Sequence, residues 1–316
     1  MSCAITQTVM PQSQTTSTHP ANPEAGKTGI RKFEIDGWCI ETCKLPILNS
    51  EQSKTFTDQL TIPLPEICFG QNRLEITHSA SGFKYNFNTL SALLLVDPTE
   101  GSEGEHLKVA YADHWSNSRK PTDAVTKVIN PFDWTYTTNY IGTDESAKNL
   151  FKRPDDVENH PGIPLAVLSR PDPILFFDEV TLFEDELHDN GMASLQVKVR
   201  VMPSCIFVLS RFFLRVDGVI FRVFDVRLFI DITKNQIIRE VKGKEMSYNE
   251  VKNKLPIEKA HDLTPLTDAN WVGHVMGMIQ KDSNFLPHSL FSSIPSERKS
   301  WKSFLGTQLE VAILQS

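Results

Sequence analysis

Apolar positions are densest in residues 176–231, and their spacing changes within this stretch. Every second side chain in residues 194–201 is apolar, and this period of two predicts a half-buried strand. Residues 206–216 are almost continuously apolar, which is typical of a strand that is covered on both faces. Asp217 and Gly218 follow this run and predict a two-residue hairpin, because a type I′ turn needs positive φ at both positions. The stretch therefore predicts an antiparallel meander.

The predicted hairpin also fixes which side chains share a face. A two-residue turn places Val216 opposite Val219, and the partners of the remaining residues follow from that pair. Ser210, Asp225 and Arg227 then lie together at the polar end of an otherwise apolar face. An aspartate beside an arginine in such a place is either a structural ion pair or an acceptor for an extended partner segment.

The opposite face of the predicted hairpin carries three arginines, Arg211, Arg215 and Arg222. Guanidinium groups crowded on one face repel one another unless anions lie nearby. One interpretation pairs them with the acidic side chains of residues 184–189 of the same protein. The other makes them a fork that binds a carboxylate or a phosphate of a partner.

The rest of the chain predicts shorter elements, from the spacing of apolar residues and from turn and capping residues. These elements are a hairpin over residues 32–43 with an Asp36-Gly37 turn, a helix over 50–60, strands over 64–76 and 81–87, a helix that Asn88 caps and that runs to residue 96, a strand over 130–142 and a helix over 242–254. Trp134, Tyr136 and Tyr140 would share one face of the strand over 130–142, as core residues or as an exposed binding platform.

The two ends of the chain differ in composition from its middle. Residues 1–28 are rich in Ser, Thr, Gln and Pro, which predicts a disordered arm. Residues 255–316 keep a few apolar anchors without a clean period, and we expect a loosely docked C-terminal extension there. Residues 29–254 remain as the main domain.

Composition and charge narrow the class of protein. The formal net charge of −7 argues against broad nucleic-acid affinity, which needs a basic surface. No apolar run approaches the length of about 18 residues that a membrane span requires, and the N-terminus lacks the basic and apolar regions of a secretory signal. Five cysteines, an odd number, favour free thiols in a reducing intracellular compartment. We therefore expect neither a nucleic-acid nor a membrane partner.

The acidic segment near the middle of the chain is a candidate for catalysis. Glu184, Glu186, His188 and Asp189 could hold a hard cation, and this set makes a metal-dependent hydrolase the alternative function. Consecutive residues of a turn point in different directions, however, so a capping or ion-pairing turn is the simpler interpretation. The cysteines lack the spacing of a zinc site, and the chain has no P-loop, dinucleotide or HExxH motif. We expect no cofactor.

Several long sequence segments carry a family resemblance. LPEICFGQNRLEI, NPFDWTYTTNYIGT, FFDEVTLFEDELHDNG, SLQVKVRVMPS and LSRFFLRVDGVIFRVFDVRLF occur in this order and together resemble the TIP-forty-one-like family, over residues 32–251. The resemblance implies an α+β fold, a mostly antiparallel β-sheet meander with flanking short helices and a binding cleft. It also implies a non-enzymatic regulator of TOR signalling that binds catalytic subunits of type 2A protein phosphatases, whose flexible C-terminal tail enters the cleft.

The resemblance carries partner-binding positions over one at a time. The aspartate in the strand after the hairpin is Asp225, and the residue two before it, often methionine in the family, is Val223. An isoleucine upstream of the FFDEV word corresponds by spacing to Ile163. A fourth position, an aspartate in some relatives, is Ser91 here, which departs from the pattern and removes that charge.

Arg227 beside Asp225, and Arg222 on the arginine face, complete the expected partner-binding set. The leading hypothesis is a cytoplasmic or nuclear regulatory protein that binds type 2A phosphatases through a cleft between the meander and residues 130–164. A third hypothesis is an adaptor whose main partner is the phosphatase-associated Tap-forty-two/alpha-four protein, as the resemblance implies for some fungal relatives.

Overall fold

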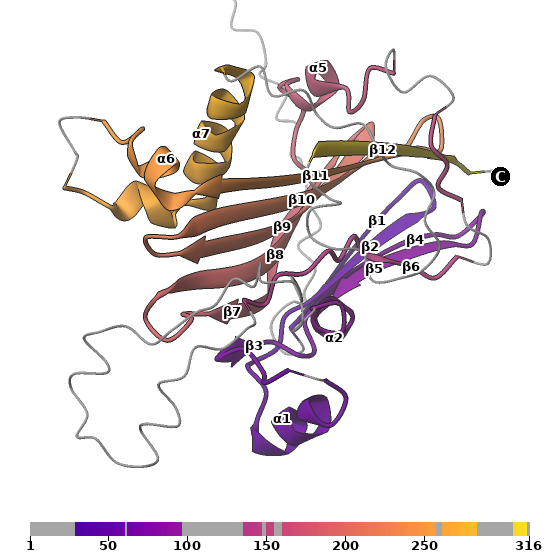
Figure 1. Cartoon of the computed structure of the whole chain (residues 1–316). Helices are drawn as coiled ribbons and strands as arrows, with labels where there is room; N and C mark the ends of the chain where they lie inside the picture. The colour runs from indigo at the N-terminus through magenta and orange to yellow at the C-terminus, as the bar shows by residue number, and fades with distance from the viewer. Residues whose placement is uncertain are drawn as a thin grey trace, which may run out of the picture.

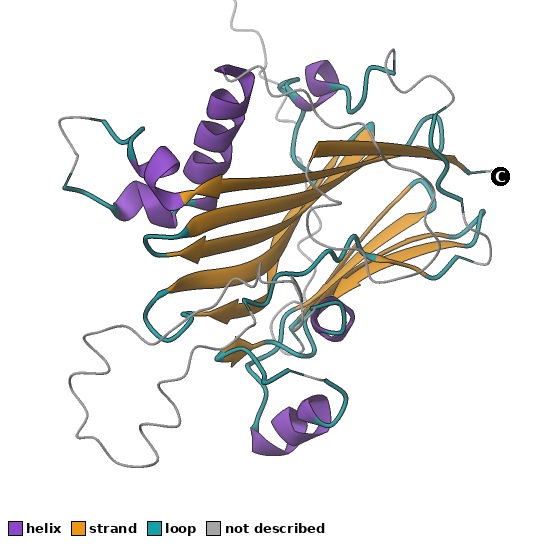
Figure 2. Cartoon of the chain, viewed as in Figure 1, coloured by secondary structure: helices purple, strands orange, loops and turns teal. Residues whose placement is uncertain are grey.

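The chain folds around two antiparallel sheets with short helices at their margins (Figures 1 and 2). The computed structural model describes residues 29–60, 62–96, 135–146, 150–154, 160–256, 261–282 and 306–314. Strands dominate this part of the chain, and most of them pair with a strand that precedes or follows them in the chain. The expected α+β class with a mostly antiparallel sheet is therefore confirmed. Among the described helices none combines the length and the apolar character needed to cross a membrane.

The smaller sheet forms from the N-terminal part of the chain. Its strand order is β1-β2-β4-β5-β6, with β1 (Ile30–Ile35), β2 (Trp38–Cys43), β4 (Arg73–His78), β5 (Phe83–Asn88) and β6 (Thr143–Asp144). Asp36 and Gly37 have φ of 46° and 81° and join Ile35 to Trp38 in a two-residue turn. The predicted first hairpin is thus confirmed, and its turn has the positive φ values of type I′.

The larger sheet is built around the predicted meander. Its order is β12-β11-β10-β9-β8-β7-β3, with β7 (Phe176–Asp185), β8 (Gly191–Met202), β9 (Cys205–Val216), β10 (Ile220–Asp231), β11 (Gln236–Ser247), and the edge strands β12 (Gly306–Ile313) and β3 (Ile67–Cys68). Strands β8 to β11 pair along their whole length without a register shift. The meander is confirmed, and it extends one strand further than the apolar stretch that predicted it.

The register predicted for the β9–β10 hairpin is wrong by one residue. Val216 pairs with Ile220, not Val219, so the loop holds three residues and Val219 is 48 % exposed within it. The Val219 N–H donates to the Val216 carbonyl at 3.0 Å, as in a four-residue β-turn, but the ladder with β9 resumes only at Ile220. Since strand side chains alternate, this slip moves every residue of β10 to the other face relative to β9.

The corrected register produces an inner face that is more apolar than the predicted one. Phe212 now lies opposite Phe224, and Val216 lies opposite Ile220. This face packs on the smaller sheet in a single core that includes Trp38, Phe83, Tyr85, Phe212, Phe224 and Leu228. Burial of this surface is the main stabilising contribution between the two sheets.

The outer face of the larger sheet is covered at its two ends and polar in between. At one end α6 (Tyr248–Lys252), the 3₁₀ turn η2 (Thr264–Thr267) and α7 (Ala269–Asp282) pack on Phe213, Phe221 and Val223. At the other end α5 (Leu165–Leu168) packs near Phe207 and Phe229. Figure 1 shows α7 and α5 standing at these two ends of the same sheet.

The remaining helices follow their capping residues. Asn49 forms a capping box with Gln52 at the start of α1 (Ser50–Thr57), as the predicted helix over residues 50–60 requires. Asn88 caps α2 (Thr89–Leu93), although this helix ends before residue 96. The helix predicted over residues 242–254 is only partly right, because pairing with β10 keeps β11 extended to Ser247 and only α6 is helical.

Residues 135–142 do not form the predicted strand. Tyr136 has φ of 54°, and its hydroxyl donates to the Leu64 carbonyl at 3.1 Å. The Tyr140 hydroxyl donates to the Asn86 carbonyl at 3.2 Å. Both rings are buried, so these tyrosines are core residues and not an exposed platform. Trp134 and residues 130–133 lie outside the described residues, as does the predicted arm over residues 1–28.

The described parts of the predicted C-terminal extension pack on the larger sheet. Val272, Val275 and Met276 of α7 are buried against it. Strand β12 pairs with β11 from Thr307 to Ile313.

Candidate functional site

A band of polar side chains crosses the outer face of the larger sheet between α7 and α5. Directly paired residues of antiparallel strands share a face, and two rows of pairs, with Lys244 from the next row, define this band. We call it the polar strip. Its members are Gln196 and Lys198 on β8, Arg211 on β9, Asp225 and Arg227 on β10, and Glu240, Lys242 and Lys244 on β11.

Asp225 lies at the centre of the polar strip and is only 4 % exposed. Arg211 binds its carboxylate with two parallel hydrogen bonds, from Nε to Oδ1 at 2.6 Å and from Nη2 to Oδ2 at 2.7 Å. Arg227 adds a third, from Nη2 to Oδ2 at 3.0 Å. Burial alone would raise the pKa of this carboxyl, but the hydrogen bonds and charge of Arg211, followed by those of Arg227, hold the pKa below its usual value. Asp225 is therefore a charged, fully engaged partner of two arginines.

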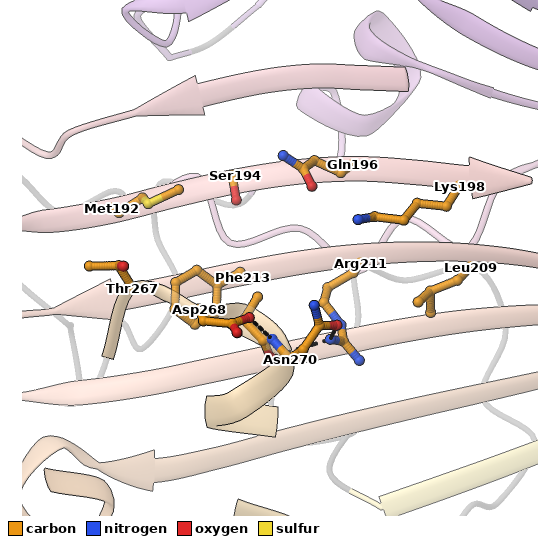
Figure 3. A pocket seen from close by; sticks show the side chains of 11 residues that line it. Met192, Ser194, Gln196, Lys198, Leu209, Arg211, Phe213, Thr267, Asp268 and Asn270 are labelled. Carbon is orange, nitrogen blue, oxygen red and sulfur yellow. Dashed lines mark hydrogen bonds between the residues drawn. The ribbon is translucent and has the colours of Figure 1, made fainter. Parts of the chain in front are cut away.

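Arg211 also ties the sheet to the start of α7. Its Nη1 donates to Asn270 Oδ1 at 2.8 Å and to the Ala269 carbonyl at 3.3 Å. Figure 3 shows this guanidinium on β9 reaching Asn270. Helix α7 lies close to the sheet at Gly273, where a Cβ would be in ordinary contact with Arg211 Nη2 and Val223 Cγ1, at 3.8 Å from each. Val223 is consequently covered by α7 and 2 % exposed.

Cations continue the polar strip onto β11. Arg227 Nη1 donates to Glu240 Oε1 at 3.2 Å. Lys244 Nζ donates to the Gly273 carbonyl of α7 at 2.6 Å. Burial, reinforced by the nearby charge of Lys242, lowers the pKa of Lys244 to about 8. The strip thus combines a neutralised centre at Asp225 with basic side chains beside it.

A pocket of about 210 Å³ opens beside the polar strip, between the sheet and the start of α7 (Figure 3). Its lining residues are Met192, Ser194, Gln196, Lys198, Leu209, Arg211, Phe213, Thr267, Asp268, Ala269 and Asn270. Apolar side chains of the sheet form part of its floor, and polar groups of η2 and α7 form its rim. This volume suits one or two side chains of a partner better than a whole small-molecule ligand, which usually occupies about 300 Å³ or more.

Ile163 lies on the same outer face as Asp225 but at the α5 end. It packs with Met202, Phe229 and Leu309 in the cluster beneath α5. Its neighbour Gly162 approaches the polar strip, since a Cβ there would lie 3.7 Å from Glu240 Oε2. The structure therefore brings Ile163, Val223, Asp225 and Arg227 to one face of one sheet.

Arg222 does not belong to this face. It lies on the inner side of β10, where its Nε donates to Glu245 Oε2 at 2.7 Å and its Nη1 donates to Thr137 Oγ1 at 3.0 Å. The predicted arginine face is wrong, because the register slip separates Arg222 from Arg211 and Arg215. Pairing within the protein is the right interpretation of the three arginines, but with Asp225, Asp217 and Glu245 instead of the 184–189 segment.

Ser91 lies away from the polar strip. It belongs to α2, which follows β5 of the smaller sheet and contributes to the core between the sheets. Its backbone N–H donates to Asn88 Oδ1 at 2.8 Å as part of the helix cap. The structure does not bring Ser91 together with Asp225.

The acidic segment forms a tight left-handed turn between β7 and β8. Leu187, His188 and Asp189 have φ of 50°, 53° and 64°. Asp185 is buried and accepts hydrogen bonds from the backbone N–H groups of Glu66 and Leu187 at 3.0 and 2.7 Å. Glu184 lies on β7, where it accepts a hydrogen bond from Gln196. Across the described ranges, no three His, Cys, Asp or Glu side chains are grouped as metal ligands would be.

Sequence reasoning missed Lys242, Lys244 and the contribution of α7. The two lysines alternate with Val241 and Gly243, and this period of two could have placed them on the outer face. No local pattern indicates that α7 packs over Arg211, since that contact joins residues 58 positions apart.

Comparison with known proteins identifies a family for this chain. The family model described as the TIP41-like family matches residues 67–252. The human TIP41-like protein is 40% identical over 248 residues, which cover 73% of this chain and 87% of the human protein.

Two fungal relatives carry a more specific name. The type 2A phosphatase activator TIP41 of Saccharomyces cerevisiae is 35% identical over 271 residues, 80% of this chain and 74% of the relative. The type 2A phosphatase activator tip41 of Schizosaccharomyces pombe is 31% identical over 243 residues, 76% of this chain and 91% of the relative. The family model covers more than half of the chain, and these relatives align with most of it, so the chain belongs to the TIP41-like family.

Proposed function

We propose that this protein is a non-enzymatic regulator of type 2A protein phosphatases that binds their catalytic subunits and acts in TOR signalling, in the cytoplasm and the nucleus. The observation that carries the proposal is family membership, with two fungal relatives named type 2A phosphatase activators. These names describe the relatives, and the inference to this chain rests on similarity over most of its length.

The outer face of the larger sheet is the proposed binding surface. The polar strip and the pocket beside it supply charged groups, an apolar floor and a helix rim in one place. Ile163, Val223, Asp225 and Arg227, four of the positions expected from the sequence, lie on this face. An extended segment such as the C-terminal tail of a catalytic subunit is the proposed occupant, because it can lay side chains into the pocket while its backbone follows the strip.

Asp225 acts indirectly in this proposal. Both of its oxygens are engaged by Arg211 and Arg227, so the carboxylate is not an open acceptor for the backbone of a partner. Its role is to hold Arg211 under the start of α7 and Arg227 beside Glu240. Val223 likewise supports α7 from below and does not form the exposed surface.

The test is the affinity of the purified protein for a type 2A catalytic subunit, with the subunit's C-terminal tail intact or removed. We expect binding at micromolar concentration or tighter with the tail, and a large loss without it. If the intact subunit does not bind at micromolar concentration, the proposal is wrong. Binding only in the presence of the Tap-forty-two/alpha-four protein would transfer the partner role to that protein.

A further inference from the structure

The charges of the polar strip do not balance near β11. The charged groups that act on Lys244 are three cations, Lys242, Arg227 and Arg211, and one carboxylate, Asp225. Glu240 lies nearby but is paired with Arg227, and Asp268, directly before α7, acts on Arg211 at the other end of the strip. Lys198 is already paired with Glu179. A local excess of positive charge thus lies on a chain whose net charge is −7.

The two lysines of β11 lack carboxylate partners. Lys244 donates to the Gly273 carbonyl, which is a neutral acceptor. Among the described residues, the side chain of Lys242 has no hydrogen-bond or ion-pair partner. It follows Val241 on a strand between Asp225 of β10 and Thr307 of β12, so its position is fixed by pairing on both sides.

This arrangement raises the energy of the unbound protein. Like charges brought together on a partly buried surface repel one another, and this cost is relieved when an anion enters. Burial is the larger cause of the lowered pKa of Lys244, and the nearby positive charge of Lys242 lowers this pKa further. A structural ion pair would have supplied a carboxylate here, as Asp225 does for Arg211 and Glu240 does for Arg227.

We propose that Lys242, Lys244 and Arg227 form an anion-binding subsite that receives a carboxylate or a phosphate of the partner segment. The inference rests on the proposed function for the identity of the partner, but the subsite itself is defined by this chain. Ammonium groups act as point charges without a fixed fork, so the subsite accepts either anion. Lys242 supplies the free charge, while Lys244 and Arg227, already oriented by Gly273 and Asp225, supply donors beside it.

The first test replaces Lys242 by methionine, which keeps an unbranched side chain and removes the charge. We expect Lys242→Met to weaken binding of the catalytic subunit about tenfold, which corresponds to one charge-assisted hydrogen bond. Stability to urea should be unchanged or slightly higher, because the substitution removes repulsion. Lys54→Met is the matched control, since Lys54 is an exposed residue of α1, far from α7 in Figure 1. Equal affinities of Lys242→Met and wild type would overturn the inference.

The second test needs no partner. Lysine side-chain signals of the full-length protein, followed by NMR after reductive ¹³C-methylation, report the pKa of Lys244. Inorganic phosphate or acetate, compared with chloride at equal ionic strength, should raise this pKa in the wild type and raise it less in Lys242→Met. A response to phosphate alone would identify a phosphorylated side chain as the occupant, and a response to both would make a carboxylate sufficient. The same pKa in all three salts would overturn the subsite. If the catalytic subunit does not bind the wild type, the proposed function fails and this titration alone decides the inference.

Discussion

Replacing Asp225 by asparagine tests how the polar strip is held together. The change keeps the size of the side chain but removes the charge that Arg211 and Arg227 share. The amide retains one acceptor oxygen and turns its NH₂ group toward a guanidinium, so at least one hydrogen bond is lost. Arg211 keeps its bonds to Asn270 and Ala269, which limits the damage to α7.

The expected magnitude follows from burial. Removing one partner of a buried ion pair costs about 3–5 kcal/mol, and the retained acceptor places Asp225→Asn near the lower end. A loss of about 3 kcal/mol with an m value of about 3 kcal/mol/M moves the urea midpoint down by about 1 M. A domain with a stability of about 5–15 kcal/mol remains folded after this loss. Binding of the catalytic subunit should weaken as well, because Arg211 and Arg227 lose their fixed orientation.

The pH dependence gives an independent check of this reasoning. Asp225 has a pKa held below its usual value by the two arginines. Because the carboxyl has a lower pKa in the folded protein than in the unfolded chain, its ionised form stabilises the fold. This contribution to the free energy of unfolding is fully present above the pKa of about 4 in the unfolded chain, and it is lost as the pH falls through the pKa in the folded protein. The difference between wild type and Asp225→Asn should therefore be constant near neutral pH and shrink below about pH 4.

Urea unfolding of wild type, Asp225→Asn and Asp217→Asn between pH 3 and pH 7 is the assay. Asp217 is paired with Arg215 at the exposed β9–β10 turn, and loss of an exposed pair costs at most about 1 kcal/mol. A loss at Asp225 no larger than at Asp217, or a difference that does not change with pH, would refute the assignment of Asp225 as the charged centre of the strip.

Three further predictions concern the fold. Arg239 donates to the Tyr85 hydroxyl, pairs with Glu310 and lies over the Phe151 ring. Arg239→Met should therefore lower the free energy of unfolding, measured by urea unfolding, by about 2 kcal/mol. An unchanged urea midpoint would contradict this prediction. Gly273→Ala should raise the free energy of unfolding by about 0.5–1 kcal/mol through helix propensity, since its Cβ meets Arg211 and Val223 at ordinary contact distance. Gly142→Ala should instead lower thermal stability, because Gly142 has φ of +95° and its Cβ would overlap Tyr85; the same direction of change in both glycine variants would be inconsistent with the structure.

Local signals in the sequence were sufficient for much of the fold. The Asp36-Gly37 hairpin, the Asn88 cap and the alternation in β8 each depend on residues within a few positions of one another. The long apolar run of β9 correctly predicted a strand covered on both sides, since the smaller sheet lies on one face and α7 on the other.

Tertiary contacts decided what the sequence left open. The loop length at Val219 sets the register of β10, and a dipeptide that favours a two-residue turn cannot exclude a three-residue one. The strand propensity of residues 135–142 is overridden by hydrogen bonds from Tyr136 and Tyr140 to distant carbonyls. The sequence correctly placed Asp225 and Arg227 on one face, but the register slip moves Ser210, which was expected beside them, to the inner face. The burial of Val223 under α7 depends on packing across the chain.

The central claim, that the outer face of the larger sheet receives the tail of a type 2A catalytic subunit, is tested most directly by photo-crosslinking. A photoreactive residue placed in that tail, in complex with the full-length protein, should form crosslinks with the polar strip and with the start of α7. Crosslinks confined to the smaller sheet or to α2 around Ser91 would contradict the account.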